Sequence, residues 1–467
     1  MADVLLSRAS GKAVPVTLLT EAAYGAWLRR QPKRAAQWLK VHEFAARQGS
    51  FCVLPDAAGK PSSVIAGLSE PPSLWDLADL PMRLPAGVYR LDWNGPLAFH
   101  EWLALGWALG AYRFTRYKKS KKQPASLILS KGSDAAKIKR YAEAIARARD
   151  LINTPAEDMG PAELAQAVIG MGKKFGAKVT QIIGDDLRRK NYPAIHTVGR
   201  ASSRAPRLVD LVWGNPKHPR VTLVGKGVCF DTGGLDLKNS AGMYFMKKDM
   251  AGAACALAIA SMIMDAKLPV RLRLLIPAVE NSVSGNAYRP TDVITMRNGL
   301  TVEVGNTDAE GRLILADALA EAAREKPQFV IDFSTLTGAA RTALGTDLPA
   351  LFCTDDTLAD DLCDAGKQME DQLWRMPLYT PYEKMLESSI ADLNSCPHSP
   401  YAGAITAALF LRRFAAPKQA WAHIDFMAWN PGSKPGRPEG GEAMTVRAVY
   451  RMIEIRSQKP EIRSRKK

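Results

Sequence analysis

The stretch from Val221 to Asp249 reads VTLVGKGVCFDTGGLDLKNSAGMYFMKKD and holds the signals of a strand, a glycine-rich loop and a helix start. A β-branched run predicts a strand that ends at Val224. The loop after it places glycines beside Lys226, Asp231 and Lys238, and glycine lets a backbone approach a ligand closely. Because sites in α/β sheets lie in loops at the carboxyl ends of strands, this stretch predicts a candidate site as well as a fold.

The rest of the C-terminal two thirds alternates between short β-branched runs and longer helical stretches. Strands are predicted at Lys178–Ile183, Arg207–Trp213, Val221–Val224, Arg271–Val279, Phe329–Phe333 and Ala422–Ala428. Helices are predicted at Met250–Ala266, Leu313–Glu325, Thr357–Met369 and Gly403–Phe414. This alternation is typical of the α/β class and predicts a mixed, largely parallel sheet covered by helices.

The N-terminal part predicts a second, smaller α/β domain over residues 1–130. Its strand signals lie at Ser50–Leu54 and Gly87–Asp92, and its helical stretches at Glu21–Lys40 and Phe99–Tyr112. Residues 131–160 are predicted to hold a connecting helix, and residues 161–467 the larger domain. A helix should begin near Pro161, because proline suits the first turn of a helix.

Composition indicates a globular protein in the cytoplasm. The chain of 467 residues is 47% hydrophobic and 24% charged, which is ordinary for a water-soluble enzyme. Residues Met1 to Lys12 hold no apolar run that would predict a signal peptide. The apolar segment from Ala251 to Met264 is too short to cross a bilayer, so no membrane partner is expected. The scattered cysteines form no CxxC and predict reduced thiols.

The net charge of +16 is concentrated near the N-terminus, where residues 1–150 contain 23 Lys and Arg against 12 Asp and Glu. A run at Lys118–Lys122 and a second at Arg463–Lys467 contribute to it. One interpretation is an anionic partner such as nucleic acid. The other, which we favour, is solvated charge on a loop and a tail.

A second motif, Asn306-Thr307-Asp308-Ala309-Glu310-Gly311-Arg312, directly precedes the apolar helix predicted from Leu313. If this heptapeptide is extended, Asp308, Glu310 and Arg312 point to one side and the two small residues to the other. Two carboxylates and a guanidinium on one face would produce a strong local field.

Each carboxylate alone has an ordinary structural explanation: Asp249 could cap a helix and Asp231 could belong to a turn. Brought into one cavity with Asp308 and Glu310, they would repel one another severely. Their combined charge of −4 is what two divalent cations would balance. The pair of motifs therefore predicts a two-metal site.

With these residues the sequence resembles the leucyl aminopeptidase (cytosol aminopeptidase) family of dimetal exopeptidases. The heptapeptide NTDAEGR matches the signature of that family, and VGKGxxFDTGG followed by KKDM resembles its other active-site stretch. The resemblance runs from about Leu151 to the end of the chain. It includes Asn153-Thr154-Pro155, Thr335-Leu336-Thr337-Gly338 and Gly403-Ala404-Ile405-Thr406-Ala407-Ala408.

The resemblance implies a role for each charged residue of the two motifs. Asp231 and Glu310 would bridge two metal ions, Asp308 would complete one metal site, and Lys226 and Asp249 would complete the other. Lys238 would stabilise the oxyanion, and Arg312 would hold a bicarbonate that acts as general base. None of the six histidines falls within either motif, so another proton acceptor is needed. The alternative for Lys238 and Arg312 is a structural ion pair with the acids.

The resemblance also implies a substrate and an assembly. The protein would remove the N-terminal residue of peptides, with two Mn²⁺ or Zn²⁺ ions per chain, and would form a homohexamer. Substrate-binding positions would be Met246, Thr335, Leu336 and Gly338, with Ala428 a further candidate. Because these residues are uncharged, they favour an uncharged side chain such as Leu or Met. Alternatively, Met246 simply belongs to the core.

Two positions depart from the pattern of the family. Asn239 follows Lys238 where relatives commonly carry proline, and the stretch 435–443 differs from the corresponding loop of well-known members. Substrate preference therefore follows less directly from the resemblance than reaction type does.

Overall fold

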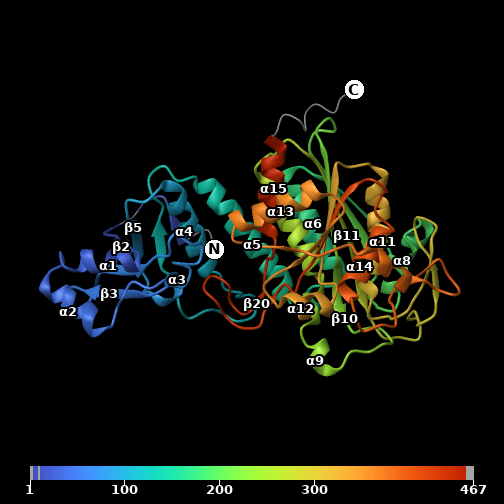
Figure 1. Cartoon of the computed structure of the whole chain (residues 1–467), viewed down its shortest axis with the longest axis horizontal. Helices are drawn as coiled ribbons and strands as arrows, with labels where there is room; N and C mark the ends of the chain where they lie inside the picture. Colours follow the sequence, from blue (N-terminus) through green and yellow to red (C-terminus); the bar gives the residue numbers. More distant parts are fainter. Residues whose placement is uncertain (1–3, 9–10, 459–467) are drawn as a thin grey trace. The chain divides into compact units, whose positions relative to one another are not determined.

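A computed structural model describes residues 4–8 and 11–458, and the chain divides into two compact units (Figure 1). The first unit comprises Met1–Ala146 together with Asn430–Glu439, and the second comprises Arg147–Trp429 together with Gly440–Lys467. The basic run Arg463–Lys467 lies outside the described residues. Among residues 4–8 and 11–458, no helix is long and apolar enough to cross a bilayer.

The first unit is built on a six-stranded sheet. Its order is β1 (Leu5–Leu6), β6 (Ser126–Ile128), β5 (Val88–Asp92), β2 (Val14–Leu19), β4 (Pro61–Gly67) and β3 (Phe51–Pro55). All neighbours pair in parallel except β3 and β4. The strands predicted near residues 50 and 87 are confirmed as β3 and β5, whereas β2 and β4 escaped prediction.

Helices α1 (Glu21–Leu28) and α2 (Lys33–Val41) replace the single helix expected over Glu21–Lys40. The expectation was wrong because Pro32 stands at the N-cap of α2 with ψ of 141°, a conformation that no helix continues through. Helix α4 (Leu97–Gly110) includes most of the predicted Phe99–Tyr112. The lysines of the run Lys118–Lys122 are exposed on the loop between α4 and β6.

The second unit contains a nine-stranded sheet. Its order is β16 (Trp374–Arg375), β15 (Ala350–Cys353), β18 (Ala420–Asp425), β14 (Phe329–Ser334), β9 (Arg220–Gly225), β11 (Arg271–Asn281), β8 (Arg207–Trp213) and β7 (Lys178–Ile183), with β10 (Gly227–Asp231) also paired to β11. The neighbouring strands β18, β14, β9 and β11 are parallel to one another. Strand β15 pairs antiparallel with β18, and β8 pairs antiparallel with both β11 and β7. The predicted mixed, largely parallel sheet is confirmed.

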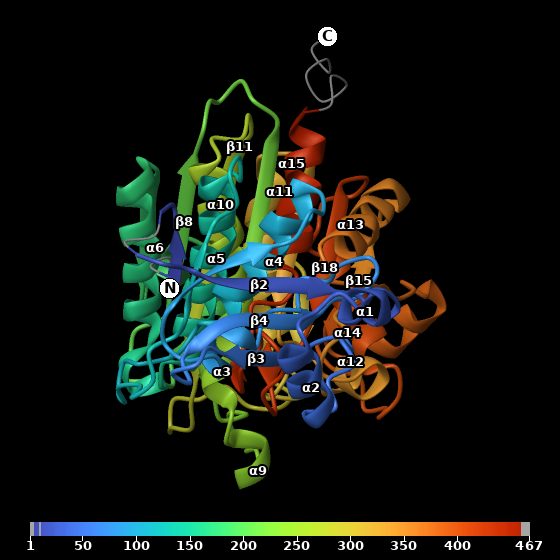
Figure 2. The same cartoon turned by 90° about the vertical axis from the view of Figure 1, so that its left-hand side faces the viewer.

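Helices cover both faces of this sheet (Figures 1 and 2). One group consists of α6 (Pro161–Phe175), α10 (Ala251–Asp265), α13 (Asp356–Gln368) and α15 (Val446–Gln458), and the other of α8 (Pro193–Gly199), α11 (Glu310–Arg324) and α14 (Gly403–Arg412). Pro161 occupies the first turn of α6, as expected. Helix α5 (Ala135–Asn153) precedes α6 in the chain.

Small residues let α10 approach the sheet closely. A Cβ atom added to Gly252 would lie 2.1 Å from the carbonyl oxygen of Phe333, and one added to Gly225 would lie 2.5 Å from Cα of Ala253. Ala253 N donates to the carbonyl of Lys226 (2.9 Å). This close packing explains the run of small residues after Asp249, and it fixes the start of α10 beside the end of β9.

Candidate active site

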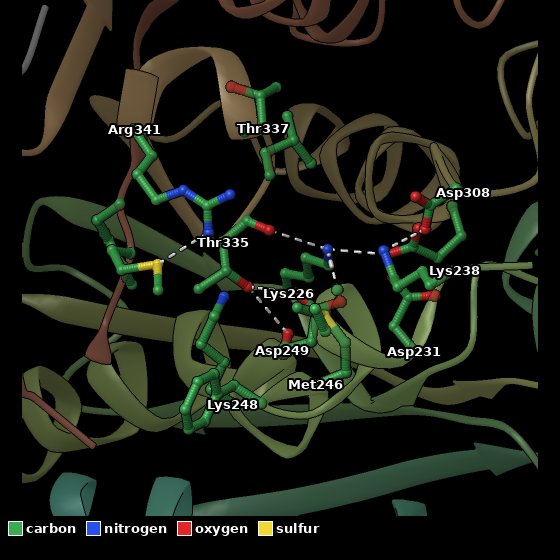
Figure 3. A pocket seen from close by; sticks show the side chains of 18 of the residues that line it. Lys226, Asp231, Lys238, Met246, Lys248, Asp249, Asp308, Thr335, Thr337 and Arg341 are labelled. Atoms are coloured by element: carbon green, nitrogen blue, oxygen red, sulfur yellow. Dashed lines mark hydrogen bonds and ion pairs between the residues drawn. The ribbon is translucent and has the colours of Figure 1, made fainter. Parts of the chain in front are cut away.

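A pocket of about 600 Å³ is lined by residues at the carboxyl ends of strands in the second unit (Figure 3). Lys226 follows β9, Asp231 ends β10, Thr335 follows β14 and Phe426 follows β18. Parallel strands place such residues along one edge of a sheet. The two sequence motifs, which lie about 80 residues apart, therefore meet in this pocket as expected.

Lys226 lies between two carboxylates on one side of the pocket. Its Nζ is 2.8 Å from Oδ2 of Asp249 and 2.8 Å from Oε1 of Glu310. It also donates to the carbonyl of Thr335 (3.2 Å). All three charged side chains are nearly fully buried. Asp249 belongs to the 3-10 helix η3 (Met246–Met250), so it reaches the pocket from the segment just before α10.

Lys238 lies between the other two carboxylates. Its Nζ is 2.9 Å from Oδ2 of Asp231 and contacts Oδ1 of Asp308. Oxygen atoms of Asp231, Asp308 and Glu310 lie within 4.8 Å of one another. We refer to Asp231, Asp249, Asp308 and Glu310 as the carboxylate cluster.

Buried hydrogen bonds hold the two motifs together beneath the carboxylate cluster. Asn281, the last residue of β11, donates through Nδ2 to Oδ1 of Asp231 (2.9 Å) and to the carbonyl of Thr307 (3.0 Å). Thr307 in turn donates through Oγ1 to the carbonyl of Gly233 (2.6 Å). Tyr288 also donates to the Thr307 carbonyl (2.6 Å). These contacts fix the position of Asp308 relative to Asp231.

Repulsion within the carboxylate cluster contributes to raised pKa values of two of its members. Burial, together with the charge of Asp231, raises the pKa of Glu310 to about 8 and that of Asp308 to about 6. Burial alone would raise the pKa of Asp249 too, but Lys226 and Lys248 hold it below its usual value. Of Glu310 and Asp308, Glu310 is the one whose charged form most needs an additional cation nearby.

The carboxylate cluster fits divalent metal ions. Three of its buried oxygens, Asp249 Oδ2, Asp308 Oδ1 and Glu310 Oε1, accept no well-directed hydrogen bond within the described part of the chain and face lysine ammonium groups. Buried carboxylates are stable only when paired or bound to metal. Carboxylate oxygens are also the ligands that hard divalent cations accept.

The NTDAEGR segment differs from its expected extended form, because α11 begins at Glu310 and not at Leu313. Ala309 has φ of −108° and ψ of 35°, which ends the loop, and a glutamate at a helix N-terminus is favoured by the helix dipole. Side chains two residues apart in an α-helix point to nearly opposite sides. Glu310 therefore faces Lys226, while Arg312 lies on another side of α11.

Arg312 is buried and is absent from the residues that line the pocket. Its Nη1 donates to the carbonyl of Ser395 (2.8 Å), and its Nε has no hydrogen-bond partner among the described residues. Burial lowers the pKa of Arg312 below its ordinary value. The predicted meeting of Arg312 with Asp308 and Glu310 on one face was wrong.

The four predicted substrate-binding residues Met246, Thr335, Leu336 and Gly338 all line the pocket, whereas Ala428 does not. Thr335 donates through Oγ1 to Oδ1 of Asp249 (2.5 Å). Buried Asp425, at the end of β18, accepts bonds from the backbone N–H groups of Leu336 (2.9 Å) and Thr337 (3.1 Å). Asp425 therefore anchors the loop that supplies this wall.

Sequence reasoning missed several residues that line the pocket, among them Lys248, Arg341, Phe426 and Met427. Lys248 stands beside Asp249 in the quoted KKD, and Arg341 lies one helical turn after Gly338 in α12 (Gly338–Leu344), so both were within reach of the motifs. The departure at Asn239 also has a structural role. Its Oδ1 accepts from Gly242 N (2.8 Å) and caps the short helix α9 (Ser240–Met243).

Comparison with known proteins agrees with this geometry. Residues 146–450 match the model of the cytosol aminopeptidase family, catalytic domain, and residues 14–130 match that of the M17 aminopeptidase N-terminal domain. The probable cytosol aminopeptidase of Mycobacterium leprae (strain TN) is 40% identical over 369 residues, which cover 75% of this chain and 70% of the relative. That of Syntrophotalea carbinolica is 41% identical over 370 residues, covering 75% and 74%.

Solved structures give the same result. The crystal structure of cytosol aminopeptidase from Coxiella burnetii superposes with a TM-score of 0.94 at 48% identity, covering 98% of this chain and 100% of that one. The bottromycin maturation enzyme BotP in complex with Mn gives a TM-score of 0.86 at 33% identity, covering 96% and 100%. The family model spans most of the chain, and the signature residues meet in one pocket. The chain therefore belongs to the cytosol aminopeptidase family of metal-dependent exopeptidases.

Proposed function

We propose that this aminopeptidase uses two divalent metal ions held by the carboxylate cluster and Lys226. The observation that carries the proposal is the convergence of the four carboxylates in one pocket. Buried oxygens of three of them accept no well-directed hydrogen bond within the described residues and face lysine ammonium groups. Asp231 and Glu310 would bridge the ions, Asp308 would complete one site, and Lys226 with Asp249 would complete the other. The similar enzyme BotP was solved in complex with Mn, which favours Mn²⁺ over Zn²⁺.

Lys226 can act as a ligand only when its amine is neutral. In the structure, Asp249 and Glu310 hold the pKa of Lys226 well above its ordinary value, even though burial acts to lower it. Adjacent divalent cations act in the opposite direction, because they repel the ammonium form. The position of Lys226 Nζ between two of the proposed ligands supports this role.

When bound, the ions would supply a water molecule of lowered pKa and a site for the free α-amino group of the substrate. Lys238 reaches the same space and would donate to the developing oxyanion at the scissile carbonyl. Arg312 would hold a bicarbonate as general base. The buried Nε of its guanidinium has no hydrogen-bond partner among the described residues, which supports an anion there. These side chains together account for a site without histidine.

For the substrate side chain we propose an uncharged residue such as Leu or Met. Met246, Leu336, Phe426 and Met427 supply an apolar wall to the pocket, which favours a side chain with an aliphatic stem. We further propose a cytoplasmic location and a homohexameric assembly, as the family resemblance implies. Light scattering coupled to gel filtration tests the assembly, because a monomer would contradict it.

The experiment that tests the proposed function measures metal content and activity on leucine p-nitroanilide with the same preparation. Two bound ions per chain and hydrolysis that follows metal loading are expected. Metal-loaded protein that leaves the anilide intact, or activity at fewer than two ions per chain, would contradict the two-metal proposal.

A second candidate function is binding of DNA by the first unit. The exposed lysines Lys118, Lys119, Lys121 and Lys122 form no ion pair within the described residues, so they are free to contact phosphates. Affinity for duplex DNA should then fall steeply as salt rises. Absence of binding, or an affinity independent of salt, would eliminate this role.

A further inference from the structure

Two cationic side chains, Lys248 and Arg341, lie on the side of the pocket away from Lys238 and Asp308 (Figure 3). Lys248 belongs to η3 and is only 5% exposed, whereas Arg341 belongs to α12. Their nitrogen atoms point toward the same space beside Thr335. We call this pair the cationic end of the pocket.

Neither member of the cationic end forms an ion pair with a carboxylate of residues 4–8 or 11–458. Arg341 donates from Nη1 to Sδ of Met427 (3.5 Å), and sulfur is a weak acceptor. A buried ammonium beside a guanidinium is costly unless an anion joins them. The cationic end therefore has unused capacity to bind an anion.

The carboxylates nearest to Lys248 are already engaged. Asp249 contacts Lys226 and accepts from Thr335. Asp425 accepts bonds from Leu336 N and from Thr337, through both N and Oγ1. These two carboxylates act on Lys248 through their charge, without forming an ion pair with it. The anion that completes the cationic end must consequently come from outside the described chain.

A substrate carboxylate is the anion that this position fits. We propose that Lys248 and Arg341 bind the side-chain carboxylate of an N-terminal Glu, or less completely of Asp, so that the substrate range extends beyond uncharged residues. The apolar wall of Met246, Leu336, Phe426 and Met427 would contact the methylene stem. The planar fork of Arg341 matches a carboxylate in two parallel hydrogen bonds.

A dipeptide could offer the same chemistry through its C-terminal carboxylate. The placement favours the side chain, because both cations lie beside positions assigned to side-chain recognition. Lys248 stands two residues after Met246 in η3, and Arg341 lies one turn after Gly338 in α12. The cationic end would also repel N-terminal Lys and Arg. This inference rests on the proposed aminopeptidase activity, which it refines.

The test compares kcat/KM for the p-nitroanilides of Glu, Leu and Lys with metal-loaded protein. These substrates have no C-terminal carboxylate, so any charge effect comes from the side chain. Wild-type protein should hydrolyse the Glu and Leu anilides and disfavour the Lys anilide. Arg341→Gln and Lys248→Gln should each lower the Glu/Leu ratio about ten- to a hundredfold, as expected for losing a charged hydrogen-bond partner.

Lys247→Gln is the matched control, because it removes the same charge from the residue next to Lys248. The Lys247 side chain does not line the pocket and donates instead to the carbonyl oxygen of Asn153 (2.8 Å). Its Glu/Leu ratio should stay within about twofold of wild type, as expected for a charge outside the pocket. Arg341→Lys, which keeps the charge but loses the fork, should recover part of the preference.

Three results would overturn the inference. The first is an unchanged Glu/Leu ratio in both glutamine variants, including the case in which activity falls equally with the two anilides. It would show that the cationic end does not recognise the substrate side chain. An effect confined to free dipeptides, absent with their C-terminal amides and with the anilides, would assign it to the terminal carboxylate. A metal-loaded wild type inactive on every anilide would remove the proposed function itself, whereas the first two results leave it intact.

Discussion

Gly311 lies directly against the side chain of Lys226. A Cβ atom added to Gly311 would come within 2.6 Å of Lys226 Cε and 2.7 Å of its Nζ. Nζ at that point is 2.8 Å from both Asp249 and Glu310. The small residue in the heptapeptide therefore makes room for the lysine that we propose as a metal ligand.

Gly311→Ala should displace Lys226 and weaken metal binding without unfolding the protein. The contact falls on the flexible end of a lysine, so the fold can adjust, but the amine loses its position between the two carboxylates. We expect fewer than two ions per chain at metal concentrations that saturate wild type, and activity that recovers partly when metal is raised.

Gly170→Ala in α6 is the control for this substitution, because nothing lies within 4 Å of an added Cβ there. It should retain wild-type metal content and turnover. If Gly311→Ala bound metal as wild type does, the proposed ligand role of Lys226 would lose its steric support.

Exhaustive chelation should abolish hydrolysis of an unblocked dipeptide, and Mn²⁺ or Zn²⁺ should restore it. The reason is the carboxylate cluster, whose shared negative charge requires cations. Acetylation of the substrate amine should also stop cleavage, because the acetylated nitrogen no longer binds metal. Persistent activity after metal loss has been verified by elemental analysis would contradict the two-metal proposal.

Glu310→Ala should lower turnover by several orders of magnitude, since it removes a ligand proposed to bridge both ions. The fold should persist, because the change relieves repulsion among buried carboxylates, a repulsion that contributes to raising the pKa of Glu310 to about 8. Circular dichroism, metal analysis and kcat on leucine p-nitroanilide provide the check. Near-normal turnover with two bound ions would exclude Glu310 as a ligand.

Much of the nine-stranded sheet could be predicted, because runs of β-branched residues are typical of buried strands. Strands β7 and β8 agree with their predictions residue for residue, and α13 agrees to within one residue at each end. Strand β15 escaped notice because Ala350–Cys353 is short and carries no β-branched residue. Strand β10 was hidden within a glycine-rich segment that resembled a loop.

The carboxylate cluster was predictable because its members sit in two short motifs that must converge if cations are to balance them. What the sequence could not supply was the direction of each side chain. Helix α11 begins three residues earlier than predicted, and for this reason Arg312 and Glu310 point to different sides of the helix. The cationic end was missed for a related reason, since Arg341 reaches the pocket only because α12 begins at Gly338.

Asp317→Ala should destabilise the second unit, although Asp317 does not line the pocket. The buried carboxylate of Asp317 accepts backbone hydrogen bonds from Ala194 (2.8 Å), Ile195 (3.3 Å) and Arg297 (3.1 Å). Each unpaired buried donor costs about 1–3 kcal/mol, so a loss of at least about 2 kcal/mol is expected in urea unfolding. Exposed Asp364→Ala is the control and should shift the free energy of unfolding by less than about 0.5 kcal/mol. Equal unfolding midpoints for the two variants would contradict this explanation.

The last prediction separates the two lysines of the pocket. Lys238→Ala removes the group proposed to stabilise the oxyanion, and losing one such donor costs about 10²–10³ in kcat. Metal content should remain two per chain, because removing a cation from beside Asp231 and Asp308 cannot weaken their attraction for metal ions. Lys226→Ala should instead lower the affinity for one ion and be rescued partly by excess metal. If excess metal rescued Lys238→Ala and left Lys226→Ala inactive, the two roles would have to be exchanged.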